Sequence, residues 1–144
     1  MKTVNEMKMT IESRSVNEGF SRVAIGAFVA SLDPDVEEIS DIKAAVSEAV
    51  TNAIIHGYRE KTGKIYITVS IFENNTVRIR IRDKGVGIEN IKQAMEPLFT
   101  TAGSERSGLG FAVMESFMDS VRVTSQVGKG TTVTLKKRIW GKNC

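Results

Sequence analysis

Two neighbouring segments, 64–72 and 76–83, alternate between apolar and polar or exposed positions. In each segment isoleucine or valine occupies every second position along the central part. This period of two is typical of a strand that buries one face. Glu73-Asn74-Asn75 separates the segments and has the composition of a turn. We therefore predict a hairpin here, and with it an antiparallel or mixed sheet.

The other segments add strands at both ends of the chain and helices between them. Further strands are predicted over 6–13, 120–127 and 131–139. Helices are predicted over 15–31, 36–58 and 107–119, with a short one near 89–95. Since the helices must cover one face of the sheet, the class is α+β: a two-layer sandwich with a mixed, mostly antiparallel sheet.

The length of 144 residues predicts a single domain over 1–144 with one hydrophobic core and a disordered end from about residue 140. No run of about 18 apolar residues indicates a membrane helix. The first residues hold no apolar block before a cleavage site, so we expect a cytoplasmic protein without a membrane partner. Cys144 is the single cysteine, which excludes an internal disulfide.

The charge balance gives little sign of a polyanionic partner. Lys and Arg number 20 and Asp and Glu 17, which leaves a formal net charge of +3. The densest basic stretch, Lys136, Lys137 and Arg138, is interpreted as a solvated strand end. We therefore expect no nucleic-acid partner.

The helix predicted over 15–31 carries two apolar stripes. Ser15 and Glu18 have the spacing of a capping box at its start. The stripe assigned to the core consists of Val16, Phe20, Val23 and Ala27. The opposite face is predicted to be a partner-binding surface of Glu18, Arg22, Ile25 and Val29. The alternative is a helix packed on both sides.

Asp83 ends the strand 76–83 on its inward face, because it continues the period of the apolar residues before it. A carboxylate in that position needs a partner. Gly85 and Gly87 follow, and glycines at this spacing let the backbone approach a ligand. The alternative is a tight turn with a structural aspartate.

Thr131 has the same inward phase on the last strand. A hydroxyl and a carboxylate at the ends of inward-facing strands can bind one polar heterocycle, whose exocyclic amine needs an acceptor such as Asp83. The alternative is a threonine chosen for its strand propensity.

Glycines also mark the start of the helix 107–119, in Ser107-Gly108-Leu109-Gly110-Phe111. The first N–H groups of a helix lack internal partners and favour phosphate. The nearby polar residues Thr100, Thr101, Ser104 and Arg106 are consistent with a phosphate lid. The alternative is a flexible loop before an ordinary helix start.

Glu48 and Asn52 lie four residues apart and so share one face of the helix 36–58. An amide oxygen can complete a Mg²⁺ shell beside phosphate oxygens, and a glutamate one turn away can orient or deprotonate a nucleophile. The alternative is a surface glutamate and a helix-end asparagine. His56, the single histidine, is interpreted as structural.

The order of these motifs over about 36–136 resembles the Bergerat-fold ATPases, which include gyrase and the catalytic domains of histidine kinases. The resemblance implies ATP or ADP as ligand, with Mg²⁺ on Asn52 and the adenine amine on Asp83. It implies that the glycines cradle phosphates, matched here by Gly85, Gly87, Gly108 and Gly110. The other residues expected to bind nucleotide are Thr100, Thr101, Ser107, Leu109, Phe111 and Thr131.

The strings SEAVTNAIIHGY, RDKGVGI, PLFTT, ERSGLGF and GKGTTV are similar to the anti-sigma-F factors of spore-forming bacilli, a family of small serine kinases. The resemblance implies that the chain inhibits a sporulation sigma factor and phosphorylates a serine of an anti-anti-sigma protein. Glu48 matches the general base, and we expect Arg106 to contact the γ-phosphate.

Other functions remain open at this point. One is a nucleotide-gated binding module without catalysis, and another is the catalytic domain of a histidine kinase. A homodimer is implied by the resemblance, and the N-terminal strand with Met7, Met9 and Ile11 could pair across two chains at a sheet edge.

Overall fold

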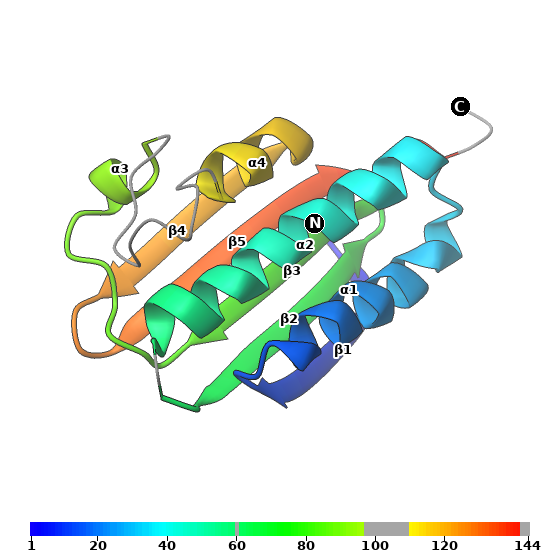
Figure 1. Cartoon of the computed structure of the whole chain (residues 1–144). Coiled ribbons are helices and arrows are strands. Elements are labelled where there is room, and N and C mark those ends of the chain that lie inside the picture. The colour runs from blue at the N-terminus through cyan, green and yellow to red at the C-terminus, as the bar shows by residue number, and fades with distance from the viewer. Residues whose placement is uncertain (60, 97–109, 142–144) are drawn as a thin grey trace.

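A computed structural model describes residues 1–59, 61–96 and 110–141 of the chain (Figure 1). The strands are β1 (Thr3–Glu12), β2 (Lys64–Phe72), β3 (Thr76–Asp83), β4 (Ser120–Gln126) and β5 (Gly130–Arg138). The helices are α1 (Val16–Val29), α2 (Val36–Asn52), α3 (Ile91–Ala94) and α4 (Gly110–Phe117). Two short turns extend helices, the 3-10 helix η1 (Ala30–Leu32) after α1 and the π-helix η2 (Ala53–Gly57) after α2.

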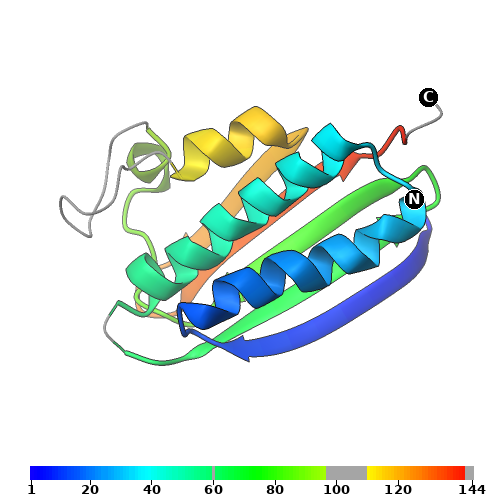
Figure 2. The same cartoon turned by 45° about the vertical axis from the view of Figure 1, so that its right-hand side comes forward.

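The strands form one sheet in the order β1-β2-β3-β5-β4. Every pairing is antiparallel, so the described sheet contains none of the mixed pairing that the sequence left open. α1, α2 and α4 lie on the same face of the sheet, with α2 between the other two (Figures 1 and 2). This is the predicted two-layer α+β sandwich.

The core lies between the two layers and is built by the alternation that identified the hairpin. Ile67 and Ile81 stand opposite each other in β2 and β3, and Ile79 pairs with Leu135 of β5. Each of these four side chains is at most 2% exposed. Val46 and Val50 of α2 cover them from the helical layer and are completely buried. Asp83, the last residue of β3, is in phase with Ile79 and Ile81, so its side chain points into the interface between sheet and helices.

Helix α1 buries the face opposite to the predicted one, so that prediction is wrong. Val16, Phe20 and Val23 are 72%, 55% and 66% exposed. The buried residues of α1 are Ser21, Ile25, Gly26 and Val29. The physical reason is close packing on α2: a Cβ atom on Gly26 would lie 2.7 Å from Cε of Lys43.

This inversion also corrects the predicted partner surface. Ile25 and Val29 are fully buried in the core, so they cannot line a surface. Glu18 and Arg22 do remain at the surface, where an ion pair of 2.9 Å joins them along the helix. The exposed apolar residues of α1 are Val16, Phe20 and Val23, which lie across the helix from this pair. We call these three apolar residues the α1 face.

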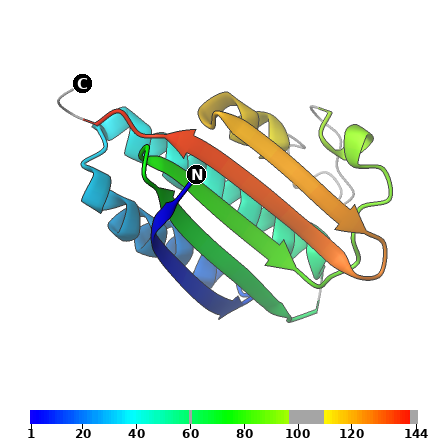
Figure 3. The ribbon, with the colours of Figure 1, turned by 180° about the vertical axis from the view of Figure 1, so that it is seen from behind.

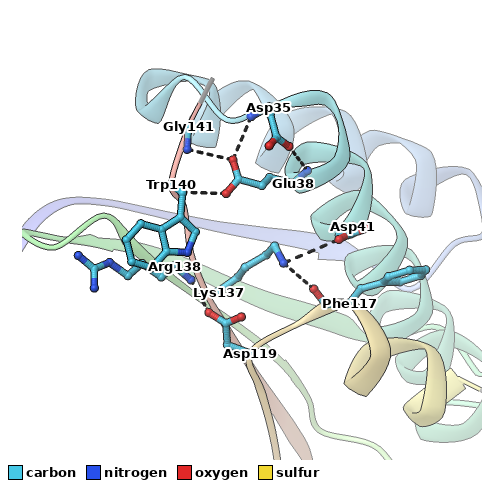
Figure 4. A network of polar contacts seen from close by, with 9 residues as sticks. All are labelled: Asp35, Glu38, Asp41, Phe117, Asp119, Lys137, Arg138, Trp140 and Gly141. Carbon is cyan, nitrogen blue, oxygen red and sulfur yellow. Dashed lines mark hydrogen bonds and ion pairs between the residues drawn. The ribbon is translucent and has the colours of Figure 1, made fainter. Parts of the chain in front are cut away.

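A polar clasp holds the end of the described chain against the start of α2 (Figure 4). The Glu38 carboxylate accepts hydrogen bonds from the backbone amides of Trp140 (2.8 Å) and Gly141 (3.1 Å). Asp35 and Glu38 also form a capping box, whereas the side chain of Ser15, before α1, makes no capping bond. Trp140 and Gly141 are therefore tied to α2, while residues 142–144 lie outside the described chain and the disordered end stays a prediction.

The clasp affects the charge state of Glu38. Burial raises the pKa of this carboxyl, but the amides of Trp140, Asp35 and Gly141 and the charge of Lys137 outweigh burial and lower it overall. Lys137 links two further elements, because its ammonium donates to the Phe117 carbonyl at the end of α4 and lies 3.8 Å from Asp41 of α2.

Within the described residues, no helix combines the length and apolarity that crossing a membrane requires.

Candidate functional site

A cavity of about 800 Å³ opens where α2 and η2 meet β3, β5, α3 and the start of α4. Six residues that the sequence assigned to a nucleotide site line it: Asn52, Asp83, Gly87, Gly110, Phe111 and Thr131. They come from segments far apart in the chain, and the fold brings them together. A cavity of this size is in the range of small-molecule and cofactor sites.

Asp83 and Thr131 form the inner wall of the cavity. They are direct partners across β3 and β5, and they are 5% and 8% exposed. Asp83 Oδ1 accepts a hydrogen bond of 2.9 Å from the Gly85 amide. Thr131 Oγ1 lies 2.8 Å from the hydroxyl of Ser125. The predicted inward direction of both side chains is confirmed.

The environment of Asp83 shifts its titration. Burial raises the pKa of this carboxyl, and hydrogen bonds from the backbone of Gly85 and Thr131 oppose that shift only in part. No cation among the described residues forms an ion pair with Asp83. A buried carboxylate of this kind gains most from a ligand that brings its own N–H donors.

The two glycines after Asp83 have different structural roles. Gly87 has φ +78° and lines the cavity, so it supplies the left-handed backbone that glycine favours. Gly85 does not line the cavity, and the close approach that it permits is to the backbone of Gly57 in η2, whose carbonyl accepts a 2.9 Å hydrogen bond from Val86. Gly85 therefore positions the loop rather than contacting the open space.

Glu48 and Asn52 meet the first residue of α4. A Cβ atom on Gly110 would lie 3.2 Å from both Asn52 Oδ1 and Glu48 Oε2. Asn52 lines the cavity, while Glu48 is one turn back along α2 beside it. A carboxylate and an amide oxygen therefore converge at a helix start, as their spacing predicted.

The side-chain oxygen atoms of Asn52 and Glu48 are of the kind that binds a magnesium ion shared with a phosphate. Oxygen atoms are the ligands that Mg²⁺ prefers, and it commonly keeps waters and substrate phosphates in its shell. Among the described residues, no group of three or more His, Cys, Asp or Glu side chains could hold a metal ion. A Mg²⁺ ion at Asn52 would therefore depend on phosphate oxygens and water for its other ligands.

Several cavity residues were not predicted from the sequence. His56 and Arg59 line it from η2 and the residues after it, and Asn90 and Gln93 line it from the start of α3. The π-helix turns His56 into the wall, and π-turns occur often at functional sites. The available signal for Asn90 and Gln93 was their position a few residues after the Asp83 motif.

Part of the predicted site lies outside the described residues. This part includes Thr100, Thr101, Ser104, Arg106, Ser107, Gly108 and Leu109. The roles expected for these residues remain predictions.

Sequence comparison relates nearly the whole chain to known proteins. The profile of the histidine kinase-like ATPase domain family matches residues 14–137. The anti-sigma F factor of Geobacillus thermodenitrificans is 56% identical over 137 residues, which cover 94% of this chain and 93% of that protein. The anti-sigma F factor of Clostridium acetobutylicum is 52% identical over 135 residues, covering 93% and 94% respectively.

Structural comparison gives the same fold at lower identity. The RsbU and RsbW domains of a Mycobacterium tuberculosis protein match with a TM-score of 0.68 and 22% identity, over 94% of this chain and 33% of that one. A blue-light activated histidine kinase of Erythrobacter litoralis matches with a TM-score of 0.59 and 21% identity, over 84% and 41%. These likenesses concern the fold alone.

Proposed function

The chain belongs to the histidine kinase-like ATPase family and, within it, to the anti-sigma F factors, and from this premise we propose that it is an ATP-dependent serine kinase that also binds and inhibits a sporulation sigma factor. Its phosphorylated substrate would be a serine of an anti-anti-sigma protein.

One observation carries the proposal: a single cavity is lined both by a buried acceptor, Asp83, and by Asn52, beside which Glu48 lies. Asp83, beside Thr131, has the chemistry to accept a hydrogen bond from the adenine amine. Asn52 and Glu48 meet at the start of α4, and the first amides of a helix favour phosphate. These features support ATP or ADP as the ligand.

Phosphoryl transfer depends mainly on positioning and on neutralising charge. In the proposed reaction the serine hydroxyl oxygen attacks the γ-phosphorus of ATP, and its proton passes to the Glu48 carboxylate. The bond between the γ-phosphorus and the oxygen that bridges it to the β-phosphate breaks, and its electron pair leaves with ADP. Mg²⁺, when bound at Asn52, neutralises phosphate charge. Arg106, outside the described residues, is proposed to contact the γ-phosphate.

The α1 face is the proposed contact for the sigma factor. Val16, Phe20 and Val23 form an exposed apolar stripe on one side of α1. An exposed stripe of large apolar side chains is typical of a protein–protein contact. It replaces the surface predicted from the sequence, because Ile25 and Val29 are buried. Glu18 and Arg22 lie across the helix from the stripe, and their role in partner binding stays a prediction.

We also propose a homodimer formed through β1. This strand lies at an edge of the sheet, as predicted, and its outer side pairs with no other described strand. A free edge strand can pair with its copy in a second chain, which would continue the sheet across the two-fold axis.

The intact mass of an anti-anti-sigma protein tests the kinase after incubation with this chain and Mg-ATP. We expect one added phosphate, on a serine, and none without Mg²⁺. Glu48→Gln should lower the transfer rate by about 100-fold or more while ATP binding survives, since general-base catalysis contributes on this order. Glu37→Gln is the matched control, because Glu37 is exposed on the first turn of the same helix.

The outcomes separate the candidate functions. Equal turnover by Glu48→Gln would remove Glu48 from the mechanism. Intact ATP binding without any added mass would replace the kinase by a nucleotide-gated binding module.

A further inference from the structure

The face of the sheet that the helices leave open is strongly basic. Figure 3 shows this face, with α1, α2 and α4 behind the strands. Along β3, β4 and β5 the side chains that point away from the core alternate with the buried ones. Gly130 shares this outward phase but has no side chain, and six of the other twelve outward positions are cationic: Arg78, Arg80, Arg82, Arg122, Lys136 and Arg138. We call these six residues the basic sheet face.

The other outward positions of β3, β4 and β5 carry no acidic residue. They are Thr76, Ser120, Thr124, Gln126, Thr132 and Thr134. The outward acids of the sheet lie on β1, where Glu6 accepts a hydrogen bond from Ser70 and Glu12 pairs with Lys64. None of the ion pairs between described residues uses a member of the basic sheet face.

Strand pairing places these cations beside one another. Arg78 stands directly opposite Lys136 across β3 and β5. Arg80 and Arg122 both face Thr134, from β3 and from β4. Like charges opposite each other destabilise a sheet, so this arrangement opposes folding, and an anionic ligand would offset the repulsion.

Aromatic rings hold several guanidinium groups in place without neutralising them. Arg78 lies over the ring of Phe72 at 5.0 Å, Arg82 over Tyr66 at 5.4 Å and Arg138 over Trp140 at 4.2 Å. Cation–π contacts restrict the side chain and leave its N–H donors available. Arginine covers one side of each ring, which leaves less ring surface on which a base could stack. Binding of a ligand to this face would therefore depend more on charge than on base stacking.

The composition of the face favours nucleic acid over an acidic protein. Protein–protein interfaces have an apolar centre depleted of charge, whereas the centre here is arginine and threonine. Arginine, lysine and threonine are the side chains that contact phosphates. Interfaces with nucleic acids are also more polar and more positive than those between proteins.

The shape of the face favours a single strand over a duplex. A duplex groove is entered by a helix or a two-stranded ribbon, and the described helices all lie on the other side of the sheet. Open sheet faces are a known platform for single strands. Arg78, Arg80 and Arg82 follow one strand at intervals of about 6.7 Å, two residues of about 3.3–3.4 Å each.

We propose that the basic sheet face binds the sugar–phosphate backbone of single-stranded nucleic acid without regard to its base sequence. This site is separate from the nucleotide cavity and does not rest on the proposed kinase function. It departs from the expectation drawn from the sequence, in which the same cations are spread over three distant segments.

Fluorescence anisotropy with a labelled oligo(dT) of about 20 nucleotides tests the proposal on the full chain, between about 50 and 200 mM salt. Single strands show a slope of about −0.7 in log K against log salt for each phosphate contacted. Arg80→Ala with Arg122→Ala should weaken binding about tenfold at the lower salt and reduce the slope by about 1.4. Arg80→Lys with Arg122→Lys should keep the affinity and the salt slope of the wild type, because the charges remain.

The matched control removes two exposed cations outside the sheet, Arg14→Ala with Lys61→Ala. It should leave the salt slope unchanged, and ATP affinity should confirm that each variant is folded. Equal losses in the two alanine pairs would overturn the proposal, since net charge alone would then explain binding. Three other results would also overturn the proposal: no binding of the oligonucleotide, tighter binding of a duplex of the same length, or binding of polyglutamate in place of the oligonucleotide.

Discussion

At the scale of single residues, the buried Asp83 carboxylate lowers the stability of the nucleotide-free protein and is also the main polar contact proposed for adenine. Burial raises the pKa of its carboxyl. A raised pKa means that the folded protein holds the proton more tightly than the unfolded chain does. The destabilisation is therefore absent below the unfolded pKa, about 3.9, and grows as the pH rises through the folded value.

We expect Asp83→Asn to separate these two effects. At pH 7 the variant should raise the melting temperature of the nucleotide-free protein, by about 2–4 °C for each kcal/mol gained. As the pH falls toward about 3.9 that gain should shrink, because the raised pKa leaves the wild-type carboxyl increasingly protonated. ATP affinity should fall tenfold or more, because an acceptor is replaced by an amide that also carries donors. Calorimetric titration and thermal unfolding measure the two effects.

The exposed Glu37→Gln is the control for Asp83→Asn as well, and it should change neither property. Unchanged ATP affinity in Asp83→Asn would exclude the adenine role. A melting temperature that falls at pH 7 would show that the carboxylate stabilises the fold.

At the scale of elements, sequence periodicity predicted the strands better than the helix faces. The bounds of β2 and β3 match the prediction because apolar and polar residues alternate without ambiguity. In α1 both faces are apolar, and the buried one includes Ser21 and Gly26. Small residues permit close packing on α2, so the larger Phe20 faces solvent, and hydrophobicity alone does not indicate that choice.

The site shows a similar division. The inward phase of Asp83 and Thr131 followed from strand period, and the Glu48–Asn52 pair from helix period. The π-helix η2 was missed because its sequence continues the apolar pattern of α2. With η2 unknown, the position of His56 in the cavity wall could not be derived.

The inverted helix leads to a prediction for α1. Phe20→Ser should leave the free energy of unfolding within about 0.5 kcal/mol of wild type, because the side chain is exposed. It should weaken binding of the sigma factor by tenfold or more if Phe20 is an anchor of the α1 face. Denaturant unfolding and a pull-down titration with the sigma factor provide the two measurements.

Ile25→Ser, on the buried side of the same helix, is the comparison. It should cost about 3 kcal/mol or more, because a cavity forms and a hydroxyl is buried. Wild-type sigma-factor affinity in Phe20→Ser would contradict the assignment of the α1 face. A small stability loss in Ile25→Ser would contradict the packing of α1.

At the scale of the whole molecule, the proposed dimer would leave the cavity and the basic sheet face available. Neither includes a residue of β1, which lies along one edge of the sheet. Pairing through β1 would therefore join two chains edge to edge without using a residue that lines the cavity.

Val4→Lys tests this arrangement, because Val4 lies in β1 and is 58% exposed. Lysine on an edge strand opposes pairing with a second strand, so sedimentation equilibrium should show a shift from twice the chain mass toward the single chain. Val36→Lys is the control, since Val36 is 80% exposed on the first turn of α2. A dimer that persists in Val4→Lys would place the contact elsewhere.

The position of β5 has a consequence for how the protein is made. β5 lies between β3 and β4, supplies Thr131 opposite Asp83, and leads into the clasp at Glu38. A ribosome adds this strand after every other strand of the described sheet, at about 5–20 residues per second. Until then β3 has an open edge and the cavity lacks a wall. The proposed ATP site is therefore completed in one step when β5 joins the sheet, and we expect a chain cut before Gly130 to be an aggregation-prone fragment rather than a weaker protein.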